Sequence, residues 1–218
     1  MIETYVASLP ATGQGEKWKD IGVKRPKGVK KIRTKGGTEP KSFVFLTMHG
    51  DQKWSWEHED DLDMLGEVLR IRLREVLRED MGGVYGVFSG GGLSRRPKQQ
   101  YGFRIGFGCA PANADALRKA VFEVVAEVKK KGASEDIITK IKEKRRRSYE
   151  TDSKENYWWS RGLQEHYRYG TDPTKLLEID AVVERVSSKR IQAAAKKFLN
   201  TKKMIDAQLL PVDGTPME

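Results

Sequence analysis

The sequence predicts an α+β fold with a mainly antiparallel sheet and helices packed on one face of that sheet. Two observations lead to this fold class. Strand patterns occur as neighbouring pairs with glycine-rich connections, which is typical of antiparallel hairpins. Helical patterns are gathered in blocks, whereas a doubly wound parallel sheet needs strands and helices that alternate one by one.

Five segments are expected as strands, most of them rich in β-branched and aromatic residues. Two of these, "VYGVFSG" and "YGFRIGFGCA", are joined by "GGLSRRPKQQ", which we expect to form a long hairpin loop. In chain order the expected strands cover residues 29–34, 41–50, 84–90, 101–110 and 204–211.

A long amphipathic helix is expected before the hairpin, ending at the glycine pair Gly82–Gly83, because glycine commonly follows a last helical turn. Glu67 and Glu75 stand three residues before Arg70 and Arg78, so we expect ion pairs between them. The apolar residues recur every three or four positions and form one stripe: Leu62, Leu65, Leu69, Leu73 and Val76.

Further helices follow the hairpin. Residues 114–132 carry an apolar stripe, and Gly132 ends that helix. Ser134 is expected to cap the next helix, and the last helix covers residues 187–199 with a serine cap.

The chain divides into a short leading segment and one domain. Residues 1–29 resemble the tail of a preceding domain followed by a linker, because Gly, Pro and Lys recur there without a hydrophobic period. Residues 30–218 are expected to form a single α+β domain.

The net charge of +10, from 41 Lys and Arg against 31 Asp and Glu, favours acidic partners. The run "KIKEKRRR" with the nearby Trp158 and Trp159 is the strongest nucleic-acid signal in the chain. The competing interpretation is favoured: the basic residues form the solvated side of a helix, and the two tryptophans pack against the sheet or a neighbouring helix.

The sequence offers no metal or phosphate motif. The histidines His49, His58 and His166 form neither HExxH nor HxxEH, so we expect no zinc bound by this chain itself. "SGGGLSRRP" lacks GxxxxGK[ST] and joins two strands rather than a strand and a helix. The single cysteine, Cys109, is expected to be a buried, inert thiol, and no apolar stretch is long enough to span a membrane.

Arg78 and Tyr85 lie on either side of the glycine pair, one near the helix end and one in the following strand. A guanidinium and a phenol supply directed hydrogen-bond donors and no base, which suits them to hold a carbonyl or an oxyanion. The structural alternative is an ion-paired arginine and a half-buried strand tyrosine.

The segment "LREVLREDMGGVYGVFSG" resembles the Arg–six residues–Tyr segment of the pitrilysin/insulinase family of zinc metallopeptidases, which includes the mitochondrial processing peptidases. The likeness extends over residues 30–211, and includes "NYWWSRGLQEHYRYGTDP", which is similar to the closing part of bacterial members. It implies a mitochondrial-processing-peptidase-like metallohydrolase domain from the later, non-zinc half of such a protein.

This resemblance also implies a function. An N-terminal domain of the parent protein would hold zinc through HxxEH, while this chain clasps a peptide or unfolded protein substrate. Arg78 would hold a substrate carbonyl, and Tyr85 would stabilise the oxyanion formed when zinc-bound water attacks the peptide bond. The isolated chain is not expected to cleave peptides, and a periplasmic or cell-envelope location is favoured over a cytoplasmic one.

Two other functions stay open. A non-catalytic member of the same family would share the fold and act as a scaffold or peptide-binding module. A basic nucleic-acid-binding domain is the less favoured third hypothesis.

Overall fold

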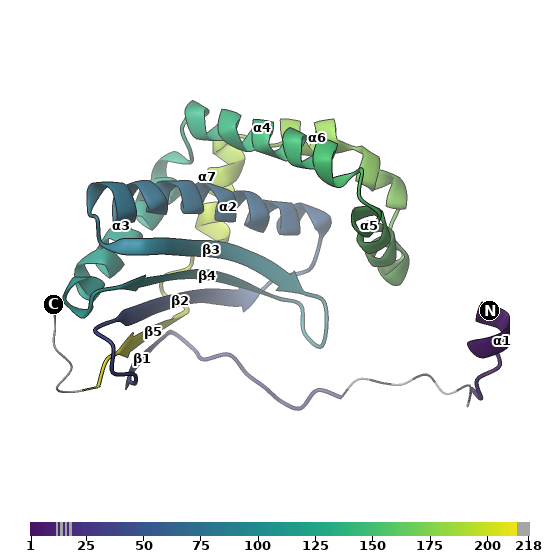
Figure 1. Ribbon diagram of the computed structural model, residues 1–218, viewed down its shortest axis with the longest axis horizontal. Helices are drawn as coiled ribbons and strands as arrows, with labels where there is room; N and C mark the ends of the chain where they lie inside the picture. Colours follow the sequence, from purple (N-terminus) through teal and green to yellow (C-terminus); the bar gives the residue numbers. More distant parts are fainter. Residues whose placement is uncertain (12, 14, 16, 18, 213–218) are drawn as a thin grey trace.

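A computed structural model describes residues 1–11, 13, 15, 17 and 19–212, except for the side chains of Asp80 and Tyr85. Figure 1 shows one twisted sheet with the helices of the main body on a single face, so the predicted α+β class is confirmed. In the described part of the chain the sheet has five strands in the order β1-β5-β2-β4-β3. No described helix is long and apolar enough to cross a membrane.

The sheet is antiparallel apart from one edge. Strands β2 and β4, β2 and β5, and β3 and β4 pair antiparallel, while β1 pairs in parallel with β5. The strand bounds are β1 Val29–Lys35, β2 Ser42–Asp51, β3 Val84–Ser94, β4 Gln100–Cys109 and β5 Met204–Leu210.

Helices α2, α3 and α7 cover one face of the sheet, and α4, α5 and α6 lie farther out on the same side (Figure 1). The short helix α1 lies apart from this body, and the predicted domain boundary near residue 29 stays a prediction. The α-helices are α1 Ile2–Tyr5, α2 Trp56–Arg74, α3 Ala114–Lys131, α4 Glu135–Asp152, α5 Asn156–Tyr169, α6 Ile179–Glu184 and α7 Ser188–Phe198. Three short turns are η1 Glu75–Asp80, a π-helix, and the 3₁₀ helices η2 Pro111–Asn113 and η3 Pro173–Leu177.

Helix α2 is the centre of the core. Its side chains on the predicted stripe are fully buried from Leu62 to Leu73, whereas Val76 is only partly buried. A Cβ atom added to Gly66 of α2 would lie 3.1 Å from the Cα atom of Gly90 in β3. The helix therefore approaches the strand as closely as two backbones without side chains allow.

The predicted long hairpin loop is wrong, because β3 and β4 extend until only residues 95–99 connect them. Gly90, Gly91 and Gly92 belong to β3 rather than to the loop. A Cβ on Gly91 would meet the ring of Phe103 at 2.7 Å and Leu62 at 3.0 Å. These glycines thus serve close packing under α2.

Asp206 ties the edge of the sheet to the helical layer. Its carboxylate is fully buried in β5 and accepts hydrogen bonds from Arg118 of α3 and from Arg33 of β1, the latter at 3.3 Å. Burial by itself would raise the pKa of Asp206, but these two guanidinium groups outweigh burial and hold the pKa below its ordinary value.

Replacing Asp206 with Asn is expected to lower the free energy of unfolding by about 3 kcal/mol at pH 7, because two arginines lose a buried counter-charge. The lowered pKa means that the carboxylate stabilises the fold above its ordinary pKa, and that this contribution disappears as the pH falls through the folded-state pKa. Urea unfolding measures the difference in free energy of unfolding between the unmodified chain and Asp206→Asn. This difference should therefore be smaller near pH 3 than at pH 7. The control Asp180→Asn, at a carboxylate that is 88% exposed, should change little.

Candidate functional site

Arg78 lies in the π-helical turn η1 that directly continues α2. The backbone N–H of Met81 donates to the carbonyl of Val76 (3.2 Å), which is the wider spacing of a π-turn. The Arg78 side chain is exposed. Short π-turns occur often at functional sites.

The expected ion pairs of Arg70 and Arg78 are wrong. Glu75 pairs with Arg72 (2.7 Å), and Glu67 pairs with residues of α4. Arg70 instead donates to the carbonyl of Ser89 (3.2 Å). The π-turn changes the angular spacing between Glu75 and Arg78, so the i, i+3 rule of a regular helix no longer applies to them.

The two glycines at the break have different roles. Gly82 has φ +60°, the left-handed conformation that ends many helices, and its N–H donates to the carbonyl of Arg78 (3.1 Å). Gly83 faces the side chain of Leu117, which a Cβ would meet at 2.8 Å. The predicted end of the helix at the glycine pair is confirmed. The close contact between Gly83 and Leu117 places the π-turn against α3.

Tyr85 lies in β3 at a β-bulge, and its side chain is outside the part of the chain that the structure describes. Val84 pairs with Cys109 and Val87 with Phe107, so Tyr85 and Gly86 stand opposite a single residue of β4. The turn η1 contacts β3. Both predicted site residues therefore lie on irregular backbone within two adjoining elements.

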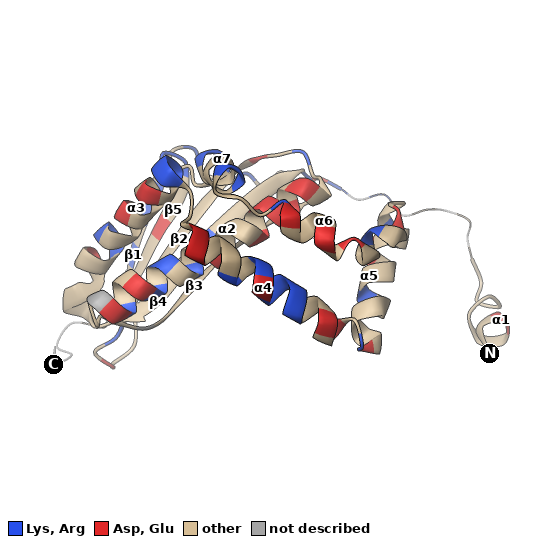
Figure 2. Ribbon diagram, turned by 90° about the horizontal axis from the view of Figure 1, so that it is seen from above, with Lys and Arg blue, Asp and Glu red and all other residues tan. Residues whose placement is uncertain are grey.

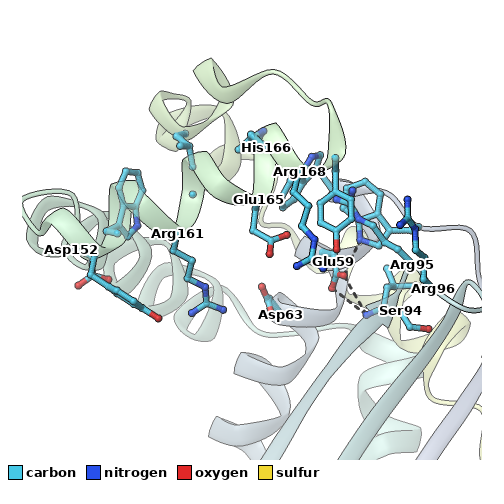
Figure 3. A pocket seen from close by; sticks show the side chains of 18 of the residues that line it. Glu59, Asp63, Ser94, Arg95, Arg96, Asp152, Arg161, Glu165, His166 and Arg168 are labelled. Carbon is cyan, nitrogen blue, oxygen red and sulfur yellow. Dashed lines mark hydrogen bonds between the residues drawn. The ribbon is translucent and has the colours of Figure 1, made fainter. Parts of the chain in front are cut away.

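A cleft of about 1110 Å³ lies at the other end of α2, beneath α5 (Figure 3). The N-terminal half of α2, the tip of the β3–β4 hairpin and α5 form its walls. Its rim is a stack in which the Arg95 guanidinium lies 3.0 Å from the ring centroid of Trp54 and 3.4 Å from that of Tyr169. The Trp54 indole N–H donates to Glu59 (3.0 Å), which orients this ring.

Asp63 projects from α2 into the cleft (Figure 3). Its side chain is open to the cleft, but the surrounding protein limits its hydration, and this burial raises its pKa to about 6. The Arg145 guanidinium opposes the shift but is engaged by Asp60 and Glu67, and these two carboxylates and Glu59 raise the pKa further.

The histidines do not form a metal centre. His49 is buried in β2, His58 contacts Lys197 of α7 (2.7 Å), and His166 is buried in α5 with Thr171 at 2.9 Å. Among the residues that the structure describes, no three His, Cys, Asp or Glu side chains are grouped to hold a metal ion. Burial raises the pKa of the Cys109 thiol to about 11, which agrees with the expected inert thiol.

The basic run of α4 is largely paired with carboxylates. Arg145 bonds to Asp60 (2.6 Å), and Arg146 bonds to Glu184 of α6 (2.9 Å). Figure 2 shows the basic segment of α4 beside acidic residues of α6. These pairs favour the interpretation that the run forms a solvated helix face, because paired cations are less available to phosphates.

The sequence did not predict the cleft. Trp158 packs on Tyr149 of α4 (centroids 5.5 Å apart), and the Trp159 indole donates to the carbonyl of Ser153 (2.7 Å). Both tryptophans thus contact the neighbouring helical segment rather than the sheet, and both remain partly exposed. The sequence feature that could have indicated the cleft is the density of aromatic and charged residues in residues 54–63 and 157–169.

Sequence comparison shows that this chain is similar to proteins of a peptidase family. A family profile described as the peptidase M16 inactive domain matches residues 1–145. The probable zinc protease PqqL of Haemophilus influenzae is 25% identical over 140 residues, which are 64% of this chain and 15% of that protein. The chain thus spans a small part of this relative's length.

Solved structures share the fold. The ferredoxin protease FusC, solved in complex with Arabidopsis ferredoxin, has a TM-score of 0.80 at 18% identity, covering 97% of this chain and 23% of FusC. The periplasmic protease PqqL of Escherichia coli has a TM-score of 0.73 at 21% identity, covering 86% of this chain and 21% of PqqL. At these identities the likeness establishes the fold.

Replacing Gly82 with Ala is expected to lower the free energy of unfolding by about 1–2 kcal/mol, because a Cβ is strained at φ +60°. Gly86→Ala is the matched control, since nothing lies within 4 Å of its added Cβ and its φ is not positive. Urea denaturation of both variants checks the difference. Equal stabilities would contradict the assigned role of Gly82.

Replacing Asp63 with Asn is expected to stabilise the chain by roughly 1 kcal/mol at pH 7.5, a value discounted for the water in the cleft. A carboxyl whose folded pKa is raised to about 6 destabilises the fold once ionised, so stability is lost as the pH rises from about 4 to 6. The stabilisation by Asp63→Asn should therefore vanish near pH 4. Thermal unfolding at both pH values measures it, with the exposed Asp115→Asn as control.

Proposed function

The chain belongs to the peptidase M16 inactive-domain family, and we propose that it is the non-zinc, substrate-clasping part of a zinc endopeptidase. In this proposal Arg78 and Tyr85 contact a peptide substrate. The relative named as a zinc protease is far longer than this chain, so cleavage belongs to the parent protein as a whole.

One observation carries the proposed roles. Arg78 lies on a π-turn and Tyr85 at a β-bulge, on adjoining elements on either side of the Gly82–Gly83 break. Both irregularities interrupt otherwise regular elements, and both kinds are enriched near active sites, where they redirect side chains. Regular packing of α2 on β3 would not require either of them.

The chemistry of these two residues is that of binding and charge stabilisation. The exposed Arg78 guanidinium can donate two parallel hydrogen bonds to backbone carbonyls of an extended peptide. A phenol at position 85 can donate one hydrogen bond to an oxygen on which negative charge develops. Neither group is a base at neutral pH, so the nucleophile must come from elsewhere.

Zinc would supply that nucleophile by activating water, and the described residues of this chain offer no ligand set for it. The proposal therefore places zinc in an N-terminal domain of the parent protein, which is the partner that this chain faces. The E. coli relative is named as a periplasmic protease, and we place the parent protein in the periplasm or cell envelope on that ground.

The test uses the parent protein with Tyr85→Phe or Arg78→Ala. Loss of an oxyanion donor is expected to lower kcat by about 100-fold or more in the Tyr85→Phe variant, with zinc content unchanged. Arg78→Ala should mainly raise KM, because it removes a contact to the ground state as well. Peptide cleavage and bound zinc are measured together.

The matched controls are Arg74→Ala, which removes an exposed arginine one turn earlier, and Tyr167→Phe, at a tyrosine that is 73% exposed. Both should cleave like the unmodified parent. Normal cleavage by both site variants would exclude the proposed roles and leave the chain as a scaffold or peptide-binding member of the family.

A further inference from the structure

The segment that leads into β1 runs along the open face of the sheet, which is the face that carries no helix (Figure 1). We call residues 20–28 the strap. At its start, Asp20 pairs with Lys98 in the connection between β3 and β4 (3.0 Å). At its end, the carbonyl of Gly28 accepts a hydrogen bond from the N–H of Met204 in β5 (3.1 Å). The strap therefore spans the sheet from the hairpin to β5.

Arg25 holds the middle of the strap on this face. Its guanidinium donates a hydrogen bond to the carbonyl of Tyr101 in β4. A Cβ atom added to Gly102 would lie 3.7 Å from the guanidinium of Arg25, so Arg25 lies over Gly102. Gly102 pairs with His49 of β2, and directly paired residues project from the same face of a sheet. The strap therefore passes beside the side chain of His49.

His49 is buried at this crossing, although its face of β2 is otherwise open. Residues of a strand alternate between the two faces, so Phe43 and Thr47 share the face of His49. Phe43 is 47% exposed and Thr47 is partly exposed, whereas His49 is only 1% exposed. Burial of the His49 ring thus coincides with the crossing of the strap.

The buried ring has no hydrogen-bond partner. Neither Nδ1 nor Nε2 of His49 reaches a donor or an acceptor among the residues that the structure describes. A neutral imidazole leaves one N–H group unsatisfied in this position. An imidazolium would bury a charge and two unsatisfied N–H donors, which costs far more.

The charges around His49 also oppose its protonation. The strap contributes Arg25, and the turn before β5 contributes Lys203. Burial of the ring and these two cations lower the pKa of His49, and the carboxylate of Asp51 offsets them only in part. On β4 the exposed Arg104 lies on the same face and adds positive charge near Arg25. A proton on the ring would therefore enter a site that is already positive.

We propose that His49 makes the attachment of the strap depend on pH, so that protonation of its ring releases residues 20–28 from the open face of the sheet. Release removes Arg25 from the ring and admits water to both ring nitrogens, which stabilises the imidazolium. The attached state has the lower histidine pKa, so the strap stays on the sheet above the ordinary histidine pKa and is released as the pH falls below it. Release would lengthen the free chain between α1 and β1.

The other attachments of the strap do not titrate in this range. The backbone N–H of Gly22 and the ammonium group of Lys98 lower the pKa of Asp20 below its ordinary value, so this ion pair persists in mild acid. Arg25 keeps its charge at every pH considered, because a guanidinium is not deprotonated in proteins. A change in the strap just below neutral pH therefore reports on His49.

The test follows the full chain by NMR from about pH 7.5 to about pH 5, a range in which histidine is the side chain that ordinarily titrates. Ring signals of His49 report its protonation, and backbone amide signals of residues 20–28 report attachment of the strap. We expect both sets of signals to change with one midpoint. Absence of a His49 titration above pH 5, or a titration that leaves the amide signals unchanged, would overturn the proposal.

Limited trypsin digestion measures the release independently. Cleavage after Lys24 and Lys27 should be at least about tenfold faster in the acidic state, because local opening exposes the backbone to the protease. A free peptide with the sequence of residues 20–31 corrects for the pH dependence of trypsin itself. An unchanged ratio of chain to peptide cleavage would contradict release of the strap.

Variants separate the histidine from the other contacts of the strap. His49→Gln removes the titrating ring, so the strap should no longer change with pH. Arg25→Gln keeps the ring and removes one cation, so the titration midpoint of His49 should rise. His58→Gln, at a histidine that contacts Lys197 of α7 instead, is the control and should behave like the unmodified chain.

Thermal unfolding shows whether each variant is folded, and Arg25→Gln tests the proposal by itself if His49→Gln is not. Release of the strap in acid by a folded His49→Gln variant would show that another group controls it and would overturn the proposal. An unchanged His49 midpoint in Arg25→Gln would do the same, because the strap would then have no electrostatic contact with the ring.

Discussion

The close approach of α2 to β3 is the constraint on which the rest of the structure depends. At Gly66 and Gly90 the two backbones meet with no side chain between them, and a single Cβ would already be 3.1 Å from the opposing Cα. This contact sets the height of α2 above the sheet. It thereby places η1 against β3 at one end of the helix and the N-terminal turn over the hairpin tip at the other.

The outer face of α2 is held by charge rather than by apolar packing. Arg145 of α4 and Arg190 of α7, only 12% and 20% exposed, converge on Asp60, and Arg190 also binds Asp61 (2.7 Å). Partly buried networks of this kind specify which helices are neighbours, because an arginine left unpaired there would be costly. Within the basic run that suggested nucleic-acid binding, Arg145 therefore links α4 to α2, and Arg146 links α4 to α6.

Regular patterns were sufficient to predict the core, and irregular backbone was not predictable. The stripe on α2, apart from the partly buried Val76, is buried as its spacing predicts. The ion pairs of Glu67 and Glu75 failed for two physical reasons: a π-turn altered the spacing around Arg78, and a distant helix supplied a competing cation for Glu67. The hairpin loop failed because glycines that usually indicate a turn serve close packing in β3.

The sequence by itself determined the α+β class, the buried stripes and the position of Arg78 and Tyr85 on either side of a glycine break. These follow from periodicity and local conformational preference, which act within a few residues along the chain. Only the tertiary structure decided that Trp54, Arg95 and Tyr169 meet in one stack, and that Asp63 lines the same cleft. The physical reason is that these side chains come from three segments far apart in the sequence, and their contacts arise only once α2 is fixed on the sheet and α5 is anchored beside it.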